Sequence, residues 1–164
     1  PTRTEQWITQ QYVNHNIHNA SDLTLEILSS IFNVNVFKFP MSARFDVFAG
    51  EKFIVVNSQC VEQVQREQFF HELCHVLFHG GHQSNMYHPY RELLEWEADI
   101  FQLYAALPYH IIKQYDFSCE NIVYTLANDF YVTNKLCEKR LLQIKNQMQQ
   151  NYSFVAEQTI LYNR

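Results

Sequence analysis

The chain has 164 residues, which is enough for one compact core and too few for two ordinary domains. Hydrophobic residues make up 47% of it and charged residues 18%, so its composition excludes a disordered or fibrous protein. The formal net charge is −5 and there is no run of Lys or Arg, which argues against direct binding to nucleic acid.

The cysteines and the hydropathy pattern indicate the cellular compartment of the protein. Its four cysteines are widely spaced without a CxxC pair: Cys60, Cys74, Cys119 and Cys137. This spacing argues against a cysteine-based zinc site and a dense disulfide framework, and it favours reduced thiols. No apolar run is long enough to span a membrane, and the polar segment 1–11 is not typical of a signal peptide. We therefore expect a cytoplasmic protein without a membrane partner.

The first third of the chain is predicted to form two short helices and then three extended segments. These lie at residues 4–16, 21–32, 34–39, 44–48 and 52–56. Ser21 or Asp22 is expected to cap the second helix, and Gly50-Glu51 is expected to form a hairpin turn. The pattern predicts a small, mainly antiparallel sheet.

The rest of the chain is predicted to be mainly helical. Helices are expected at residues 61–79, 90–107, 119–129 and 133–149. Gly80-Gly81 suits a left-handed cap at the end of the first of these helices, a polar loop follows over residues 82–89, and Pro108 closes the second helix. A last strand is possible from Tyr152 to Tyr162. The fold class predicted is therefore α+β with a helical C-terminal part.

One motif on the 61–79 helix carries chemistry. His71-Glu72-Leu73-Cys74-His75 is an HExxH match, and a separation of four residues places both imidazoles on one face, where they can meet one metal ion. Glu72 lies beside that face, where it could hold a water without being a ligand. An HExxH sequence also occurs by accident on helices with solvated histidines. Here the apolar residues around it predict a buried helix, which rarely carries such side chains without partners.

The third metal ligand is expected on the 90–107 helix. Glu95 and Asp99 lie four residues apart on one face with apolar flanks, so their carboxylates need a cation or hydrogen-bond donors. We predict that Glu95 binds the metal and that Asp99 accepts the outer N–H of His71. The alternative is an ordinary surface pair between Arg91 and Glu95.

Other nearby side chains fit a metal site less well. Glu92 and Glu97 are weaker ligand candidates, because Glu97 points to a different side of its helix. His79 follows His75 by another turn and is too far along the axis to reach the same ion, so we expect a helix-terminal role for it. A metzincin site needs a third histidine six residues after His75, where Gly81 stands, so that class is excluded.

The two motifs in this order resemble the ImmA/IrrE family of metallopeptidases, a gluzincin-like group. The usual pattern of that family is HELGH, then ExEAN and a helix that ends near LMP, and the matching segments here are HELCH and EWEADIFQLYAALP, within about residues 20–145. The resemblance implies a minimal zincin-like core with Zn²⁺, with Glu95 as the third ligand and Glu72 as the base. Cys74 replaces the usual Gly and Asp99 the usual Asn, and neither change removes a ligand. We expect Cys74 to be buried and inert, with sensitivity to oxidation as the alternative.

The chemistry predicted from these residues is that of a zinc metallo-endopeptidase. Glu72 would accept a proton from a zinc-held water and pass it to the leaving amine. A further donor would stabilise the developing oxyanion. The candidates for it are residues of a loop or a helix end: His82, Tyr87, His88, Tyr90 and Tyr109.

The resemblance also implies a protein substrate. Members of the family are implicated in cleaving helix-turn-helix transcriptional repressors, which releases genes of mobile elements, phages or stress responses, so such a repressor is the expected partner. The expected organisation is one compact unit, with a metallopeptidase core at 1–110, a helical, helix-turn-helix-like extension at 111–150 and a tail at 151–164. The alternative function is that of a non-catalytic binding module that sequesters a repressor or another protein.

Overall fold

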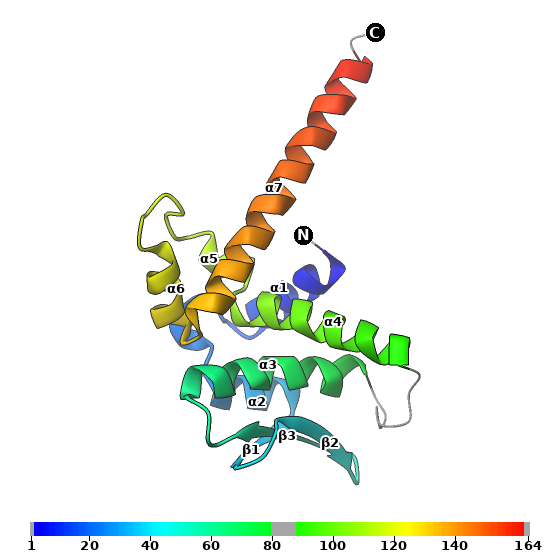
Figure 1. Ribbon diagram of the computed structural model, residues 1–164, viewed down its shortest axis with the longest axis vertical. Helices are drawn as coiled ribbons and strands as arrows, with labels where there is room; N and C mark the ends of the chain where they lie inside the picture. The colour runs from blue at the N-terminus through cyan, green and yellow to red at the C-terminus, as the bar shows by residue number, and fades with distance from the viewer. Residues whose placement is uncertain (1, 80–87, 163–164) are drawn as a thin grey trace.

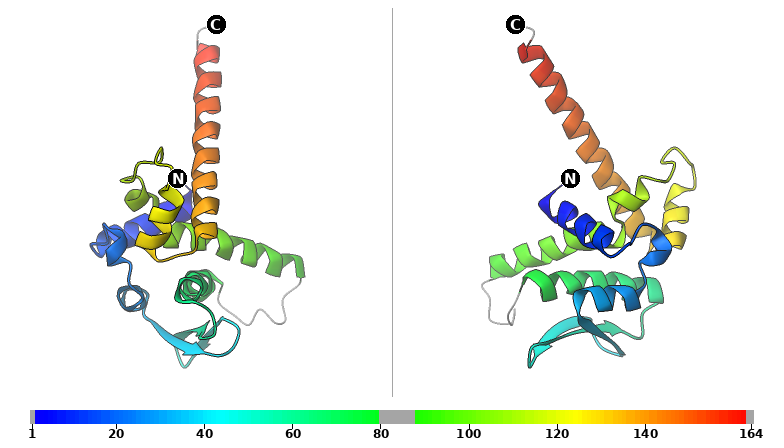
Figure 2. Two further views of the ribbon diagram at one scale, coloured as in Figure 1. Left: turned by 60° about the vertical axis from the view of Figure 1, so that its left-hand side comes forward. Right: turned by 180° about the vertical axis from the view of Figure 1, so that it is seen from behind.

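A computed structural model describes residues 2–79 and 88–162 of the chain, with side chains as far as residue 150. The described elements, in chain order, are α1 (Arg3–Asn14), the short 3₁₀ helix η1 (Ala20–Asp22), α2 (Leu25–Phe32), β1 (Val34–Phe39), β2 (Arg44–Phe48), β3 (Glu51–Asn57), α3 (Glu62–Phe78), α4 (His88–Ala106), α5 (Tyr109–Ile112), α6 (Ile122–Phe130) and α7 (Asn134–Tyr162). In Figures 1 and 2, α3 lies between the sheet and α4. The predicted α+β class is confirmed.

The three strands form a mixed sheet in the order β1-β3-β2. β2 and β3 form the predicted hairpin, and Phe48 pairs with Glu51 across a turn at Ala49-Gly50, where both residues have positive φ. The turn is one residue earlier than predicted. The expectation of a mainly antiparallel sheet was wrong for β1, which pairs with β3 in parallel. Alternation along a strand reports which face is buried and does not report the direction of the partner.

Residues before α2 form a turn that the sequence pattern placed inside the helix. Thr24 is the N-cap of α2, and its hydroxyl accepts a hydrogen bond from the backbone N–H of Ile27 at 3.2 Å. Asp22 was wrongly expected at this cap. Its carboxylate instead accepts the backbone N–H groups of His18 and Asn19, and these bonds hold the pKa of Asp22 below its ordinary value.

One hydrophobic cluster connects the sheet with the helices at both ends of the described chain. It extends from Ile8 in α1 through Phe69 and Phe70 in α3 to Ile144 in α7. Arg140 of α7 is fully buried in the same region, and it pairs with Glu5 of α1. α7 is therefore attached to the body of the fold by both apolar contacts and a buried ion pair.

α7 continues as a single helix to Tyr162, and its C-terminal end projects from the rest of the chain in all three views (Figures 1 and 2). The expectation of a strand from Tyr152 to Tyr162 was wrong. The sequence after Pro108 contains no Gly or Pro, so no residue breaks the helix once it has begun. Among the described helices, none is long and apolar enough to cross a membrane.

Candidate metal centre

The helix that carries the HExxH motif is covered on two sides. β2 and β3 pack on one side of α3, and α4 packs on another. Phe69, Phe70 and Leu73 are fully buried, which confirms the predicted apolar surroundings of the motif. This packing fixes the backbone from which both motif histidines project, so their positions depend little on their own side-chain contacts.

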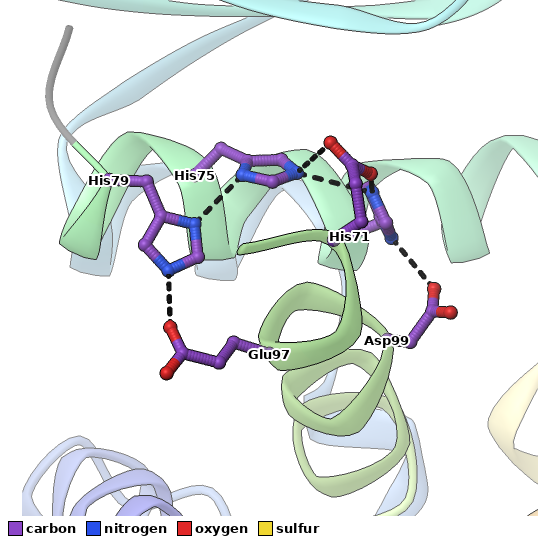
Figure 3. A network of polar contacts seen from close by, with 6 residues as sticks. His71, His75, His79, Glu97 and Asp99 are labelled. Atoms are coloured by element: carbon purple, nitrogen blue, oxygen red, sulfur yellow. Dashed lines mark hydrogen bonds and ion pairs between the residues drawn. The ribbon is translucent and has the colours of Figure 1, made fainter. Parts of the chain in front are cut away.

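The three predicted metal ligands lie together, two on α3 and one on α4 (Figure 3 labels the histidines). Nε2 of His71 is 3.2 Å from Nε2 of His75 and 3.1 Å from Oε2 of Glu95, and Nε2 of His75 is 3.6 Å from Oε1 of Glu95. One ligand atom from each residue lies within 4.8 Å of the other two. The described ion pairs of Glu95 are with these histidines and none is with Arg91, so the surface-pair alternative is not supported.

Asp99 lies behind His71, as predicted, with Oδ1 3.2 Å from Nδ1 of that histidine (Figure 3). The expectation that the carboxylates of Glu95 and Asp99 need partners because they are buried was wrong. The side chains of Glu95 and Asp99 are 47% and 66% exposed, so burial alone does not require that they bind a cation. α4 turns Ala98 and Phe101 toward the core and leaves its carboxylates at the rim.

Glu72 projects from α3 toward the edge strand β2. It is only 9% exposed, and burial raises its pKa to about 7, although His71 and a hydrogen bond from the Phe45 backbone both lower that pKa. The ring of Phe45 also stacks on His75 with the ring centroids 5.6 Å apart. Phe45 therefore touches both the candidate base and a candidate ligand. Sequence reasoning did not single it out, although strand alternation places it on the inner face of the sheet.

Residues 30–142 match the model of the peptidase family Peptidase_M78, described as the IrrE N-terminal-like domain. The chain belongs to this family. The matched span contains the HExxH motif and Glu95, and this combination makes the chain a metallopeptidase of the IrrE-like family, as the two motifs predicted.

Two proteins of Bacillus subtilis (strain 168) are similar to this IrrE-like peptidase. The phage-like element PBSX protein XkdA is 27% identical over 139 residues, which cover 84% of this chain and 70% of that protein. The uncharacterized protein YqaB is 21% identical over 139 residues, which cover 84% of this chain and 81% of that protein.

A second pair of side chains continues from the candidate metal ligands of this IrrE-like peptidase. Nδ1 of His79 is 2.8 Å from Nδ1 of His75, and Nε2 of His79 is 3.0 Å from Oε2 of Glu97 (Figure 3). His79 is the C-cap residue of α3, which agrees with the expected helix-terminal position. Sequence reasoning missed the contact with Glu97. The available signal was three histidines at a spacing of four residues, together with an acidic side chain on another face of α4.

The predicted oxyanion donors remain predictions. His82, Tyr87 and the proposed Gly80-Gly81 cap lie outside the described residues. His88 is exposed at the start of α4 beside Glu92, Tyr90 is also exposed in this turn, and Tyr109 begins α5 and packs against the core.

Cys74, between the motif histidines, is buried. Burial and the charges of Glu97 and Glu95 raise the pKa of its thiol to about 12, which keeps it protonated at neutral pH. A thiol in this state is a poor nucleophile, as expected for an inert core cysteine.

A cavity of about 630 Å³ lies between α1, α3 and α4. Its wall includes Trp7, Phe78 and Trp96, and it also includes His79 and Glu97. Cys74 contributes to the same wall. The His79–Glu97 pair thus contacts the candidate ligand His75 and also lines this cavity.

Proposed function

We propose that the chain is a zinc-dependent endopeptidase in which His71, His75 and Glu95 bind the metal and Glu72 is the general base. The observation that carries the proposal is that ligand atoms of two histidines and one glutamate lie within 4.8 Å of one another, with Glu72 next to His71 on α3. Two histidines and a glutamate would hold zinc with a ligand set that catalytic zinc sites use. α3 and α4 with the small sheet would then form a minimal zincin-like core.

Each residue near the ligands has a distinct part in the proposed hydrolysis. When bound, zinc supplies a Lewis acid that brings the pKa of a coordinated water near neutrality. Glu72 is placed to accept a proton from the attacking water and to deliver it to the leaving amine. Asp99 accepts the Nδ1–H of His71, which leaves Nε2 of that ring available for the metal.

The substrate we propose is a helix-turn-helix transcriptional repressor, whose cleavage would derepress a mobile element, a phage or a stress response. Two lines of support are the resemblance of the motifs to those of the ImmA/IrrE family and the similarity to a protein named for a phage-like element. We further propose that residues 1–110 form the peptidase core, while the helical extension at 111–150 docks the substrate. The described cysteines are all unpaired, which supports a place for this reaction in the cytoplasm.

The metal site is tested by elemental analysis of protein purified without added metal. Wild type is expected to hold near-stoichiometric zinc, and Glu95→Gln and His75→Ala are expected to hold much less. Glu72→Gln should keep its zinc, because Glu72 is not a ligand in the proposed arrangement. Well-folded wild type that binds no zinc even when zinc is supplied would refute the proposed mechanism.

The substrate is tested with the Glu72→Gln variant as a trap. This variant should bind a repressor that wild type cleaves, and mass spectrometry of the wild-type products should locate the cut bond. Glu120→Gln, which alters an exposed side chain before α6, should cleave like wild type. Stable binding without any cleavage by zinc-loaded wild type would instead support the binding-module alternative.

A further inference from the structure

Three histidines follow one another along α3 at intervals of four residues, and only two of them belong to the metal-ligand group. His79 is the third, and both of its ring nitrogens already face other side chains. His75 is 2% exposed and His79 is 8% exposed, so neither ring can rely on bulk water for its hydrogen bonds. The hydrogen-bond partners of these rings must therefore come mainly from the protein itself.

The carboxylate of Glu97 determines that arrangement. A carboxylate accepts hydrogen bonds, so a neutral His79 must carry its proton on Nε2 to donate to Glu97 over 3.0 Å. Nδ1 of His79 is then a bare acceptor. Because it lies 2.8 Å from Nδ1 of His75, that nitrogen of His75 must carry a proton and donate it.

The proton on Nδ1 of His75 also determines the state of its other ring nitrogen, which faces the candidate metal site. A neutral imidazole has one N–H, so a proton on Nδ1 of His75 leaves its Nε2 unprotonated, and this nitrogen then presents a lone pair. This is the nitrogen that faces His71 and Glu95. The direction of each hydrogen bond from Glu97 inward thus places a lone pair where a cation can accept it.

We propose that His79 and Glu97 form a positioning relay that fixes the orientation and tautomer of His75 for metal binding. The inference rests on the proposed zinc site. Neither residue of the relay touches the metal or the substrate, so both act through His75. The relay has a shorter counterpart at the other ligand, where Asp99 contacts Nδ1 of His71 directly.

Two substitutions of His79 separate the hydrogen bond from simple packing. The amide oxygen of His79→Asn can occupy the position of Nδ1 and accept the proton of His75. The longer side chain of His79→Gln reaches the position of Nε2, so it keeps a donor for Glu97 and removes the acceptor that His75 needs. If the relay acts as proposed, zinc affinity should fall by about 10- to 100-fold in His79→Gln and stay near that of wild type in His79→Asn.

Glu97 has its own matched control on the same helix. Glu97→Gln retains an amide oxygen that can accept from His79 but removes the charge, so its zinc affinity should fall by less than that of His79→Gln. Glu92→Gln breaks an exposed contact with His88 that is not connected to the ligands, and its zinc affinity should equal that of wild type. Competition with a chelator measures all of these affinities. Unfolding of the metal-free proteins measures packing losses separately.

A spectroscopic measurement tests the relay without metal. Imidazole ¹⁵N spectra of metal-free wild type should show the Nδ1–H tautomer of His75, and His79→Gln should lose this preference. Wild-type affinity in zinc-loaded His79→Gln, or equal losses in the Asn and Gln variants, would overturn the relay while leaving the zinc site intact. Wild type that shows the Nδ1–H tautomer but binds no zinc even when zinc is supplied would overturn the proposed enzyme function and support the proton arrangement.

Discussion

Replacing Glu5 by Gln should destabilise the protein because it leaves the charge of Arg140 buried without its counter-ion. Arg140 is fully buried and Glu5 is 4% exposed, so water cannot replace the lost carboxylate. Removing one partner of a buried ion pair costs about 3–5 kcal/mol. The guanidinium keeps a hydrogen bond to the Leu107 carbonyl at 3.0 Å and lies 4.8 Å above the Tyr104 ring, so we expect the lower end of this range.

Urea unfolding of the metal-free protein, followed by circular dichroism, measures this loss. A loss of about 3 kcal/mol is a large part of the roughly 5–15 kcal/mol that stabilises a typical domain. The double variant Glu5→Leu with Arg140→Met should lose less than the sum of the single variants, since it leaves no unpaired charge. Glu92→Gln, at an exposed pair, should stay within about 0.5 kcal/mol of wild type. A similarly small change in Glu5→Gln, or full additivity in the double variant, would refute the reasoning.

Three further predictions concern the metal, one histidine and one tyrosine. Chelation of zinc should lower the melting temperature by an amount that depends on the free zinc concentration, because zinc binds only the folded chain in this proposal. A melting temperature that does not respond to the chelator would count against the zinc site. Burial lowers the pKa of His110 in the folded state, so the free energy of unfolding should fall as the pH drops below about 6.5, the pKa of His110 in the unfolded chain. His110→Gln can still donate to the Ile17 carbonyl, and urea titrations should show that it loses less stability than wild type between about pH 8 and about pH 5. Tyr12→Phe removes the hydroxyl that donates to the Ala105 carbonyl at 2.9 Å in a fully buried site. The same assay should show a loss of about 1–3 kcal/mol in the free energy of unfolding, and no loss would mean that this hydrogen bond adds little net stability.

The candidate ligands could be predicted from sequence because their arrangement is local. A helix fixes the relation between His71 and His75 whatever surrounds it, and the same regularity relates Glu95 to Asp99 on α4. The prediction that Glu95 of α4 meets the two histidines of α3 also depended on the resemblance of both motifs to one family. In the structure these three candidate ligands of the two helices lie together.

What the sequence did not predict depends on contacts between distant elements. β1 could not be given a parallel partner, because its alternation fits either direction of pairing. Phe45 and Glu97 lie on separate elements from the motif, and neither has a spacing that marks it as a neighbour of His75 or His79. The course of α7 beyond residue 150 was also misjudged, because aromatic and β-branched residues favour strands only where a sheet is available to pair with them.

The cavity between α1, α3 and α4 contains both tryptophans of the chain, Trp7 and Trp96. Trp7 packs edge-on against Phe78, whereas Trp96 is largely exposed. The intrinsic indole fluorescence of the protein therefore arises entirely from the wall that also holds His79 and Glu97. A small molecule or side chain that enters this space can be followed in unlabelled protein by a change in emission. A titration monitored in this way reports from a position one side chain away from the candidate metal ligand His75.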